Sequence, residues 1–175
     1  KIFNKSNNFL KPNELGEIRI KGDNVFHSYI NDKKSTNKSF ENGWFCTGDL
    51  GYLDKNNNIY IEDRLDNMII VSGENIYPSE IERFLPNLKD LKEGYIIGLV
   101  DQIKGNQICL AYKTDFKNEE ILIRKWRKLL INKLPFYKVP SKFININSLM
   151  TKDFPRLSNG KIDKKRLAIL VNSNG

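Results

Sequence analysis

Apolar positions divide the chain into a β-rich first third and a mixed remainder. Around Ile18 and Ile20, apolar and polar residues alternate as in a strand with one buried face. Apolar residues return at 44–46, and a polar run in the middle of residues 52–61 is typical of a hairpin. The polar segment 31–43 is expected to be a loop. This part of the chain therefore predicts mainly strands.

After Arg64 the pattern alternates between short apolar runs and helical spacing. Four apolar runs predict further strands, at residues 68–71, 95–100, 107–113 and 142–146. Three helices are expected, from Pro78 to Pro86, from Asn118 to just before Pro135, and over residues 163–170. Asn118 is a suitable N-cap, and Trp126 lies on the apolar stripe of the helix that follows it. The expected fold class is α+β.

Composition limits the classes of protein to which the chain can belong. The 175 residues include 39% hydrophobic and 11% aromatic residues, which is enough for a packed core and excludes wholesale disorder. No run approaches the roughly 18 consecutive apolar residues of a membrane-spanning helix. Cys46 and Cys109 lack the spacing of a zinc or redox motif, so we expect reduced thiols, no bound metal and a cytoplasmic location.

The charge balance is basic. The chain carries 29 Lys and Arg residues against 21 Asp and Glu residues, a formal net charge of +8. A basic surface attracts anionic partners in general. The sequence has no single basic stripe with interleaved aromatic residues, so we do not expect a nucleic-acid partner. A Lys-rich solvated surface is the plainer interpretation.

Three short polar segments stand in apolar or glycine-bearing surroundings: Thr47-Gly48-Asp49, Asp63-Arg64-Leu65-Asp66 and Asn159-Gly160-Lys161. The first kind of segment is more often a turn with a local hydrogen bond to the aspartate than a catalytic site. The second lies where the two parts of the chain meet, where charges are usually linker residues or a structural ion pair. The third places a lysine ahead of a helix, and most such lysines are exposed and inert. Taken singly, none of the segments identifies a function.

The order of these segments, together with their neighbours, is more informative. The motifs read GEIRIKG, WFCTGDLGYL, EDRLDNMIIVSGENIYPSEIE, LPFYKVPSKF and LSNGKIDKKRL, and they extend from Leu15 to about Leu167. The set resembles the adenylate-forming (ANL, AMP-binding) superfamily, which includes acyl-CoA synthetases, aryl-CoA ligases, luciferases and the adenylation domains of peptide synthetases. The resemblance is greatest to acyl-CoA synthetases.

The resemblance implies a division of the chain into two parts. Members of the superfamily are much longer, and their phosphate-binding loop and acyl pocket lie in a large N-terminal domain. Residues 1–65 resemble the β-rich end of that domain, and residues 66–175 resemble the complete C-terminal lid domain, with a hinge near Asp66. Because the phosphate loop and the pocket lie outside this sequence, we expect the chain alone to be inactive.

The resemblance also implies a first reaction step, in which a small-molecule carboxylic acid and ATP with Mg²⁺ form an acyl-adenylate. Both reactants are anionic, so positive charge is needed where they meet. Lys161 matches the catalytic lysine of the superfamily, which reaches the carboxylate and the α-phosphate. Asp49 matches the carboxylate that accepts hydrogen bonds from the ribose hydroxyls, and Arg64 matches a second nucleotide-binding residue beside the ribose.

In the second implied step, a thiol from CoA or from a phosphopantetheine arm displaces AMP. The lid rotates about the hinge, here Asp66, and brings Ser72-Gly73 to line the pantetheine tunnel. A plain surface acid at Asp66 and a plain strand-ending turn at Ser72-Gly73 are the alternatives. Some relatives carry arginine or glutamine at the position of Asn75, which leaves its role open. Asp63, Asn67 and Ser72 itself also depart from the commonest residues of the superfamily.

The function expected is that of the C-terminal portion of an ATP-dependent carboxylate–CoA ligase. One alternative is an adenylation domain of the peptide-synthetase type, which loads a carrier protein. Another is a non-catalytic, lid-like docking module whose basic surface binds an acidic acyl carrier protein. The sequence does not select the carboxylic acid, because the residues of the acyl pocket are not in it.

Overall fold

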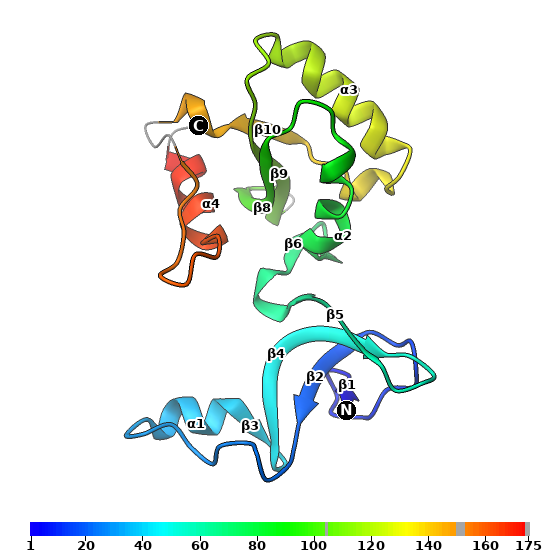
Figure 1. The fold of residues 1–175 in the computed structure, drawn as a ribbon, viewed down its shortest axis with the longest axis vertical. Helices are drawn as coiled ribbons and strands as arrows, with labels where there is room; N and C mark the ends of the chain where they lie inside the picture. Colours follow the sequence, from blue (N-terminus) through cyan, green and yellow to red (C-terminus); the bar gives the residue numbers. More distant parts are fainter. Residues whose placement is uncertain (104, 150–152, 174–175) are drawn as a thin grey trace. The chain divides into compact units, whose positions relative to one another are not determined.

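The computed structural model describes residues 1–103, 105–149 and 153–173, which form two compact units (Figure 1). The first unit is Lys1–Asp66 and the second is Asn67–Gly175. Asp66 is thus the last residue of the first unit. The α+β fold class expected from the sequence is confirmed. None of the helices in the described part of the chain has the length and apolar character needed to span a membrane.

The first unit is an antiparallel sheet built around one long strand, β4. Its order is β1-β2-β4-β3, with β5 also paired to β4. The strands are β1 (Ile2–Phe3), β2 (Gly16–Ile20), β3 (Phe40–Glu41), β4 (Trp44–Leu53) and β5 (Ile59–Arg64). Ile2, Phe3, Ile18 and Leu50 form its buried apolar residues. Trp44 is only half-buried, and its ring meets the Phe3 ring edge-on with centroids 5.3 Å apart.

The prediction of a loop at residues 31–43 is wrong, because a short helix and a strand lie there. Helix α1 spans Lys33–Ser39 and leads directly into β3. The Asp32 carboxylate accepts hydrogen bonds from the backbone N–H and the hydroxyl of Ser35, and these bonds lower the pKa of Asp32. The helix buries no residue. Periodicity could not reveal it, since an exposed helix needs no apolar stripe.

The second unit contains a three-stranded sheet of order β10-β9-β8, with helices on both faces (Figure 1). Strands β8 and β9 are antiparallel, and β10 runs parallel to β9. A separate hairpin, β6–β7, precedes the first helix. The elements are β6 (Ile69–Val71), β7 (Glu74–Ile76), α2 (Pro78–Glu82), β8 (Glu93–Asp101), β9 (Gly105–Lys113), α3 (Glu119–Ile131), β10 (Lys142–Asn145) and α4 (Lys164–Ser173). Short 3₁₀ turns occur at η1 (Leu65–Asn67), η2 (Leu85–Asn87), η3 (Phe136–Lys138) and η4 (Ile146–Ser148).

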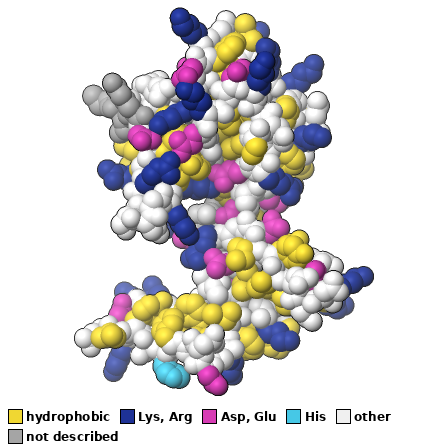
Figure 2. Space-filling view, in the orientation of Figure 1, with side chains coloured by type: hydrophobic (Ala, Val, Ile, Leu, Met, Phe, Trp, Pro, Cys, Tyr) yellow, Lys and Arg dark blue, Asp and Glu magenta, His cyan; other side chains and the backbone are white. Residues whose placement is uncertain are grey.

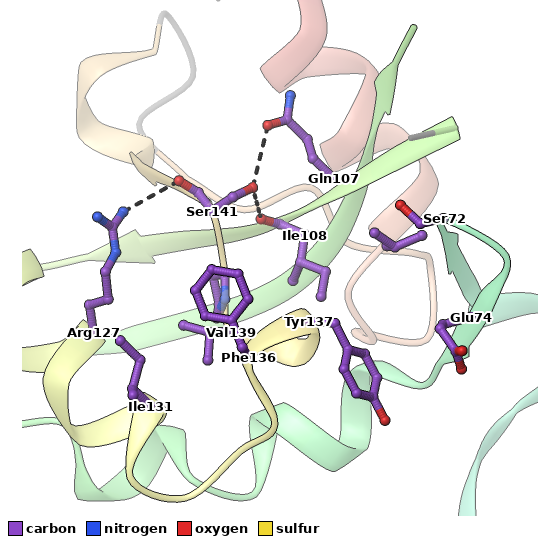
Figure 3. A pocket seen from close by; sticks show the side chains of 12 residues that line it. Ser72, Glu74, Gln107, Ile108, Arg127, Ile131, Phe136, Tyr137, Val139 and Ser141 are labelled. Atoms are coloured by element: carbon purple, nitrogen blue, oxygen red, sulfur yellow. Dashed lines mark hydrogen bonds between the residues drawn. The ribbon is translucent and has the colours of Figure 1, made fainter. Parts of the chain in front are cut away.

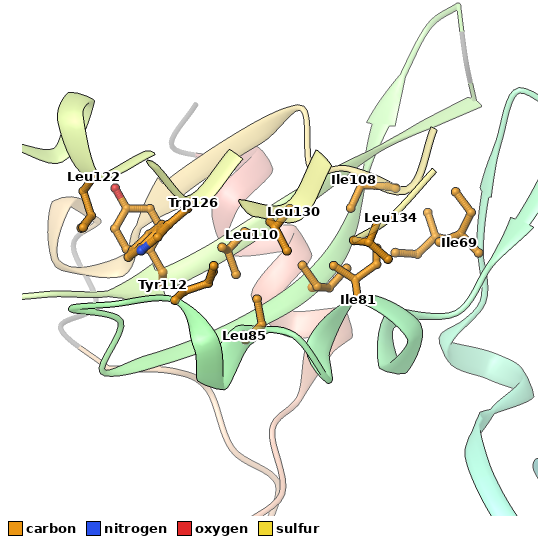
Figure 4. Close-up of a cluster of buried hydrophobic side chains, with 13 residues drawn as sticks. Ile69, Ile81, Leu85, Ile108, Leu110, Tyr112, Leu122, Trp126, Leu130 and Leu134 are labelled. Atoms are coloured by element: carbon orange, nitrogen blue, oxygen red, sulfur yellow. The ribbon is translucent and has the colours of Figure 1, made fainter. Parts of the chain in front are cut away.

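Strands β8 and β9 are apolar on both faces because each face covers a different core. Successive side chains of a strand point to opposite faces. One face contributes Ile96, Ile108, Leu110 and Tyr112 to a cluster with residues of α2 and α3 (Figure 4). The other face contributes Ile97, Leu99, Cys109 and Ala111 to a cluster with Leu167 and Val171 of α4. The run Ile-Cys-Leu-Ala-Tyr in β9 therefore has no exposed position.

Helix α3 forms within the range that the sequence predicts, with the expected N-cap and apolar stripe. The Asn118 side chain accepts a hydrogen bond from the Ile121 N–H, as expected of an N-cap. Leu122, Trp126 and Leu130 are buried along one stripe of α3. The Trp126 indole N–H donates to the carbonyl of Lys89 at 2.8 Å, which satisfies its polar atom inside the core. Trp126 is thus the core anchor that its position predicts.

Helices α2 and α4 end at other residues than the sequence predicts. Helix α2 ends at Glu82, and Pro86 lies inside the 3₁₀ turn η2 rather than closing one continuous helix. The Asp163 carboxylate accepts a hydrogen bond from the Arg166 N–H at 2.9 Å, so it caps α4, which then continues to Ser173. These differences concern element boundaries, which depend on local capping more than on apolar periodicity.

The two-sided burial of β9 gives the first testable prediction. Leu110→Ala removes a side chain with no exposed surface from the cluster beneath α3. We expect the free energy of unfolding to fall by about 2–5 kcal/mol, measured by urea denaturation. Ile169→Ala, at a position of α4 that is 65% exposed, is the control and should change it by less than about 0.5 kcal/mol. Equal effects of the two substitutions would contradict the packing described.

Candidate functional site

In the first unit, Asp49 and Arg64 face each other across neighbouring strands. They are register partners of β4 and β5. One guanidinium nitrogen of Arg64, Nη1, donates to Asp49 Oδ1 at 2.9 Å and to the carbonyl of Thr47 at 2.8 Å. The hydrogen bond to Asp49 raises the pKa of Arg64. Because the Asp49 side chain is 30% exposed and that of Arg64 is 50% exposed, both charged groups remain accessible to a ligand.

The glycine beside Asp49 makes room for this pair. Gly48 has a φ of +70°, and a Cβ built on it would lie 3.0 Å from Arg64 Nη2. The Thr47 hydroxyl donates to the carbonyl of Ile18 at 2.7 Å and accepts a hydrogen bond from the Asp49 N–H. Residues 47–49 are therefore a tightly held bend in β4 that presents a carboxylate beside a guanidinium.

Asp66 lies two residues after Arg64, in the turn η1. The Arg64 Nε atom is 3.5 Å from Asp66 Oδ1, a long contact between two half-exposed side chains. Asp63 contacts the backbone of Arg64, since its carboxylate accepts a hydrogen bond from the Arg64 N–H at 2.7 Å. The hinge role of Asp66 stays a prediction.

In the second unit, Ser72 and Gly73 form the two-residue turn of the β6–β7 hairpin. Their φ angles are +51° and +86°, the left-handed pair typical of a tight hairpin turn. Both residues are exposed, and a Cβ on Gly73 would meet no atom within 4 Å. Glycine is thus required here by its backbone conformation. Asn75 is exposed on β7 and pairs with Ile70.

Lys161 also lies at a tight turn. Gly160 has a φ of +81°, the Asn159 side chain accepts a hydrogen bond from the Lys161 N–H, and the Leu157 N–H donates to the carbonyl of Lys161 at 2.7 Å. The Lys161 side chain is exposed, and it forms no ion pair with any described residue. Its ammonium group is therefore available to an anionic ligand.

A pocket that the sequence did not indicate adjoins the Ser72 turn (Figure 3). It has a volume of about 460 Å³ and lies between the β6–β7 hairpin, strand β9, the end of α3 and the turn η3. Phe136 and Tyr137 of η3 line it, and Phe136 is 86% exposed. Arg127 and Ser141 also line it, and the Arg127 guanidinium donates to the carbonyl of Ser141 at 3.4 Å. The aromatic pair Phe136-Tyr137, directly after Pro135, is the sequence feature that could have indicated this pocket.

The sequence-predicted residues thus fall into three places. Asp49 and Arg64 are in direct contact in the first unit. Ser72, Gly73 and Asn75 share one hairpin of the second unit, and Lys161 lies on a separate turn of the same unit. Within the described residues, no group of three or more His, Cys, Asp or Glu side chains could hold a metal ion.

Curated proteins similar in sequence to this chain are named as CoA ligases. No protein-family model matches the chain. It is 31% identical over 170 residues to a 2-succinylbenzoate–CoA ligase of Geobacillus sp., and the match covers 97% of this chain and 33% of the ligase. A 2-succinylbenzoate–CoA ligase of Bacillus mycoides is 37% identical over 162 residues, which cover 91% of this chain and 32% of the ligase.

Solved structures with a similar fold include a CoA synthetase and an ATP-bound enzyme. The o-succinylbenzoate CoA synthetase of Bacillus subtilis, in complex with its acyl-adenylate intermediate, matches with a TM-score of 0.82 at 32% identity, over 95% of this chain and 33% of that chain. This chain is similar to the C-terminal region of adenylate-forming enzymes. ATP-bound MatB from Rhodopseudomonas palustris matches with a TM-score of 0.83 at 26% identity, over 98% of this chain and 33% of that chain.

The adenylate-forming resemblance expected from the sequence motifs is thereby confirmed. The chain spans about a third of the length of the relatives it matches. The roles expected for Asp49, Arg64, Asp66, Ser72, Gly73, Asn75 and Lys161 stay predictions. On the face that Figure 2 shows, Lys and Arg side chains are scattered among acidic ones rather than gathered in one stripe.

The two cysteines of the chain, Cys46 and Cys109, do not belong to the candidate site. Cys109 is fully buried in the core between the sheet and α4, and burial raises the pKa of its thiol to about 12. Cys46 is half-buried in β4, and burial also raises the pKa of its thiol. A raised pKa leaves the thiol protonated at neutral pH, and the thiolate is the reactive form.

The cysteine environments predict a clear order of alkylation. At pH 8, iodoacetamide should modify Cys46 in the native protein while Cys109 stays unmodified, because Cys109 is both inaccessible and protonated below a pH of about 12. In urea both cysteines should react at similar rates. Peptide mass spectrometry after timed quenching measures both rates. Modification of Cys109 as fast as Cys46 in the native protein would contradict its burial.

Proposed function

We propose that this chain is the C-terminal portion of an ATP-dependent carboxylate–CoA ligase. The observation that carries the proposal is the match of nearly the whole chain, in sequence and in fold, to ligases named for CoA thioester formation. One matching structure holds an acyl-adenylate and another holds ATP and a magnesium ion. The reaction proposed has two steps, adenylation of a carboxylic acid and transfer of the acyl group to a thiol.

In the adenylation step, a carboxylate oxygen attacks the α-phosphorus of ATP. The bond from this phosphorus to the bridging oxygen breaks, and pyrophosphate leaves. We assign Lys161 to stabilise the negative charge that accumulates there, since its ammonium is exposed and free of ion pairs with described residues. A lysine suits this role because it is a compact charge on a long stem.

The Asp49–Arg64 pair is assigned to the ribose of ATP. An ionised carboxylate is an acceptor only, so Asp49 can accept hydrogen bonds from the two ribose hydroxyls. Arg64 binds Asp49 through Oδ1 and so fixes the orientation of the carboxylate. Magnesium would neutralise charge on the triphosphate, and the described residues supply no carboxylate cluster to hold it. In this proposal the metal enters with the nucleotide.

In the thioester step, the sulfur of CoA attacks the acyl carbon, and AMP leaves. We assign the Ser72–Gly73 turn to the pantetheine arm, because an exposed turn without a side chain at Gly73 permits close approach. The adjoining pocket supports this assignment. Its apolar walls suit the uncharged parts of CoA, and Arg127 offers a guanidinium to a phosphate.

CoA is preferred as the acceptor because the relatives are named as CoA ligases. A phosphopantetheine arm on a carrier protein, an acyl carrier protein as partner, and a cytoplasmic location remain predictions. Asp66 is proposed as the hinge that lets the second unit serve the two steps in turn. Hinge motion of this kind is common in enzymes that close over their substrates.

Lys161 provides the decisive test of the adenylation step. In the ligase that carries this chain, Lys161→Ala should slow carboxylate-dependent ATP–pyrophosphate exchange by at least about 100-fold, the usual cost of removing one charge-stabilising group. Lys125→Ala, at an exposed position of α3, is the control and should leave the exchange rate unchanged. Normal exchange in the Lys161→Ala variant would disprove the role assigned to Lys161.

The isolated chain is proposed to be inactive. It spans about a third of the length of its relatives. Incubated with ATP, magnesium and a panel of carboxylic acids, the 175-residue chain should release no pyrophosphate above the rate without acid. Acid-dependent release, measured with a coupled pyrophosphatase assay, would overturn the proposal.

A further inference from the structure

The turn that carries Lys161 has no apolar anchor of its own. Every residue from 157 to 161 is exposed, including Leu157 at 47%. Apolar packing begins at the residues beside the turn: Phe154 before it and Leu167 in α4 are buried, and the half-buried Ile162, directly after Lys161, packs against the same core. Apolar packing therefore fixes the segments on either side of the turn and leaves the turn itself to polar contacts.

Two ion pairs fasten the turn to the rest of the unit, one before Lys161 and one after it. Before it, Arg156 donates through Nη1 to the carbonyl of Gly160 at 3.1 Å and through Nη2 to Glu93 of β8 at 2.6 Å. After it, the Lys164 ammonium lies 2.8 Å from Glu82 Oε1. The backbone that presents Lys161 is thereby tied to two other elements.

The Glu82–Lys164 pair joins the two layers of helices at the open edge of the sheet. Glu82 belongs to α2, which packs in the cluster on one face, and Lys164 belongs to α4, which covers the other. The same oxygen of Glu82 accepts a hydrogen bond from the Ile96 N–H at 2.8 Å. Ile96 lies in β8, an edge strand, so this N–H has no strand partner on that side.

Neither charge is favoured by its own helix. Lys164 is the first residue of α4, where a helix favours negative charge, and Glu82 is the last residue of α2, where it favours positive charge. Both side chains are also largely covered, with 21% and 25% of their surfaces exposed. A partly buried charge is stabilised by a partner of opposite charge, and each of these two residues is the partner of the other.

We propose that Glu82 is a positioning residue for Lys161 in the adenylation step, and this inference rests on the proposed function. Through Lys164, Glu82 fixes the start of α4 three residues after Lys161. A displacement of about 1 Å at a reacting group can cost a factor on the order of 100 in rate. Loss of the pair should therefore impair the step that uses Lys161, while the thioester step, which does not use it, continues.

The variant Glu82→Gln tests this inference in the full-length ligase. Its side-chain carbonyl can still accept the hydrogen bond from Ile96, but the ion pair with Lys164 is lost. We expect the rate constant of acyl-adenylate formation to fall by about tenfold or more. Thioester formation from supplied acyl-adenylate and CoA should stay within about twofold of the unmodified enzyme, because that step does not use Lys161. A general loss of folded protein would instead lower the rates of both steps equally.

Glu119→Gln is the matched control. Glu119 is also a half-buried carboxylate of the second unit, and it accepts hydrogen bonds from the Tyr112 hydroxyl and the Asn145 side chain on two other elements. Its hydrogen bonds go to residues outside the Lys161 turn, so both half-reactions should remain at full rate.

Two variants of Lys164 test the same ion pair from its other side. Lys164→Met removes the charge and should reproduce the selective loss of adenylation, whereas Lys164→Arg keeps the charge and should retain adenylation.

Each outcome decides between the hypotheses. Equal losses in both half-reactions, or full adenylation in Glu82→Gln and Lys164→Met, would overturn the positioning role while leaving the proposed function intact. The Lys161→Ala variant, assayed alongside, is the reference. If it adenylates normally, the proposed function of Lys161 fails, and the positioning role of Glu82 fails with it.

Discussion

The second unit depends on one constraint: strands β8 and β9 must be covered on both faces. Ile108 and Leu110 alternate with Cys109 and Ala111, so neither face of the ladder can be left in water. Helices α2 and α3 cover one face and α4 covers the other. The Glu82–Lys164 pair links the helices of the two cores at one edge of this ladder.

The groups assigned to chemistry lie outside these cores. Lys161 and the Ser72–Gly73 pair are at tight turns with left-handed backbone angles, and Asp49 follows the left-handed Gly48. Such turns project a side chain or a bare backbone into solvent, while the flanking strands and helices keep it in place. The separation is physically useful because a charged group must stay hydrated until its ligand arrives, whereas its support must stay dry and packed.

The sequence predicted those features that depend on local pattern. The two strands β8 and β9, the capping by Asn118 and the burial of Trp126 all follow from apolar periodicity and short-range hydrogen bonding. It did not predict α1, because an exposed helix has no apolar stripe. It also missed β7 and the pocket beside Ser72, since three-residue strands and concave surfaces arise from contacts between segments distant in the chain. The motifs located Lys161, but only the structure shows that it forms no ion pair with the described residues.

Charge pairing explains why the basic residues around Lys161 are not equivalent. Arg156, Lys161 and Lys164 stand within nine positions, and composition alone treats them as one basic segment. In the structure Arg156 is neutralised by Glu93 and Lys164 by Glu82, so both hold the fold together. Lys161 lies between them and keeps its charge for solvent or ligand. Unpaired cations at positions 156 and 164 would repel the Lys161 ammonium, and their pairing with carboxylates reduces this repulsion.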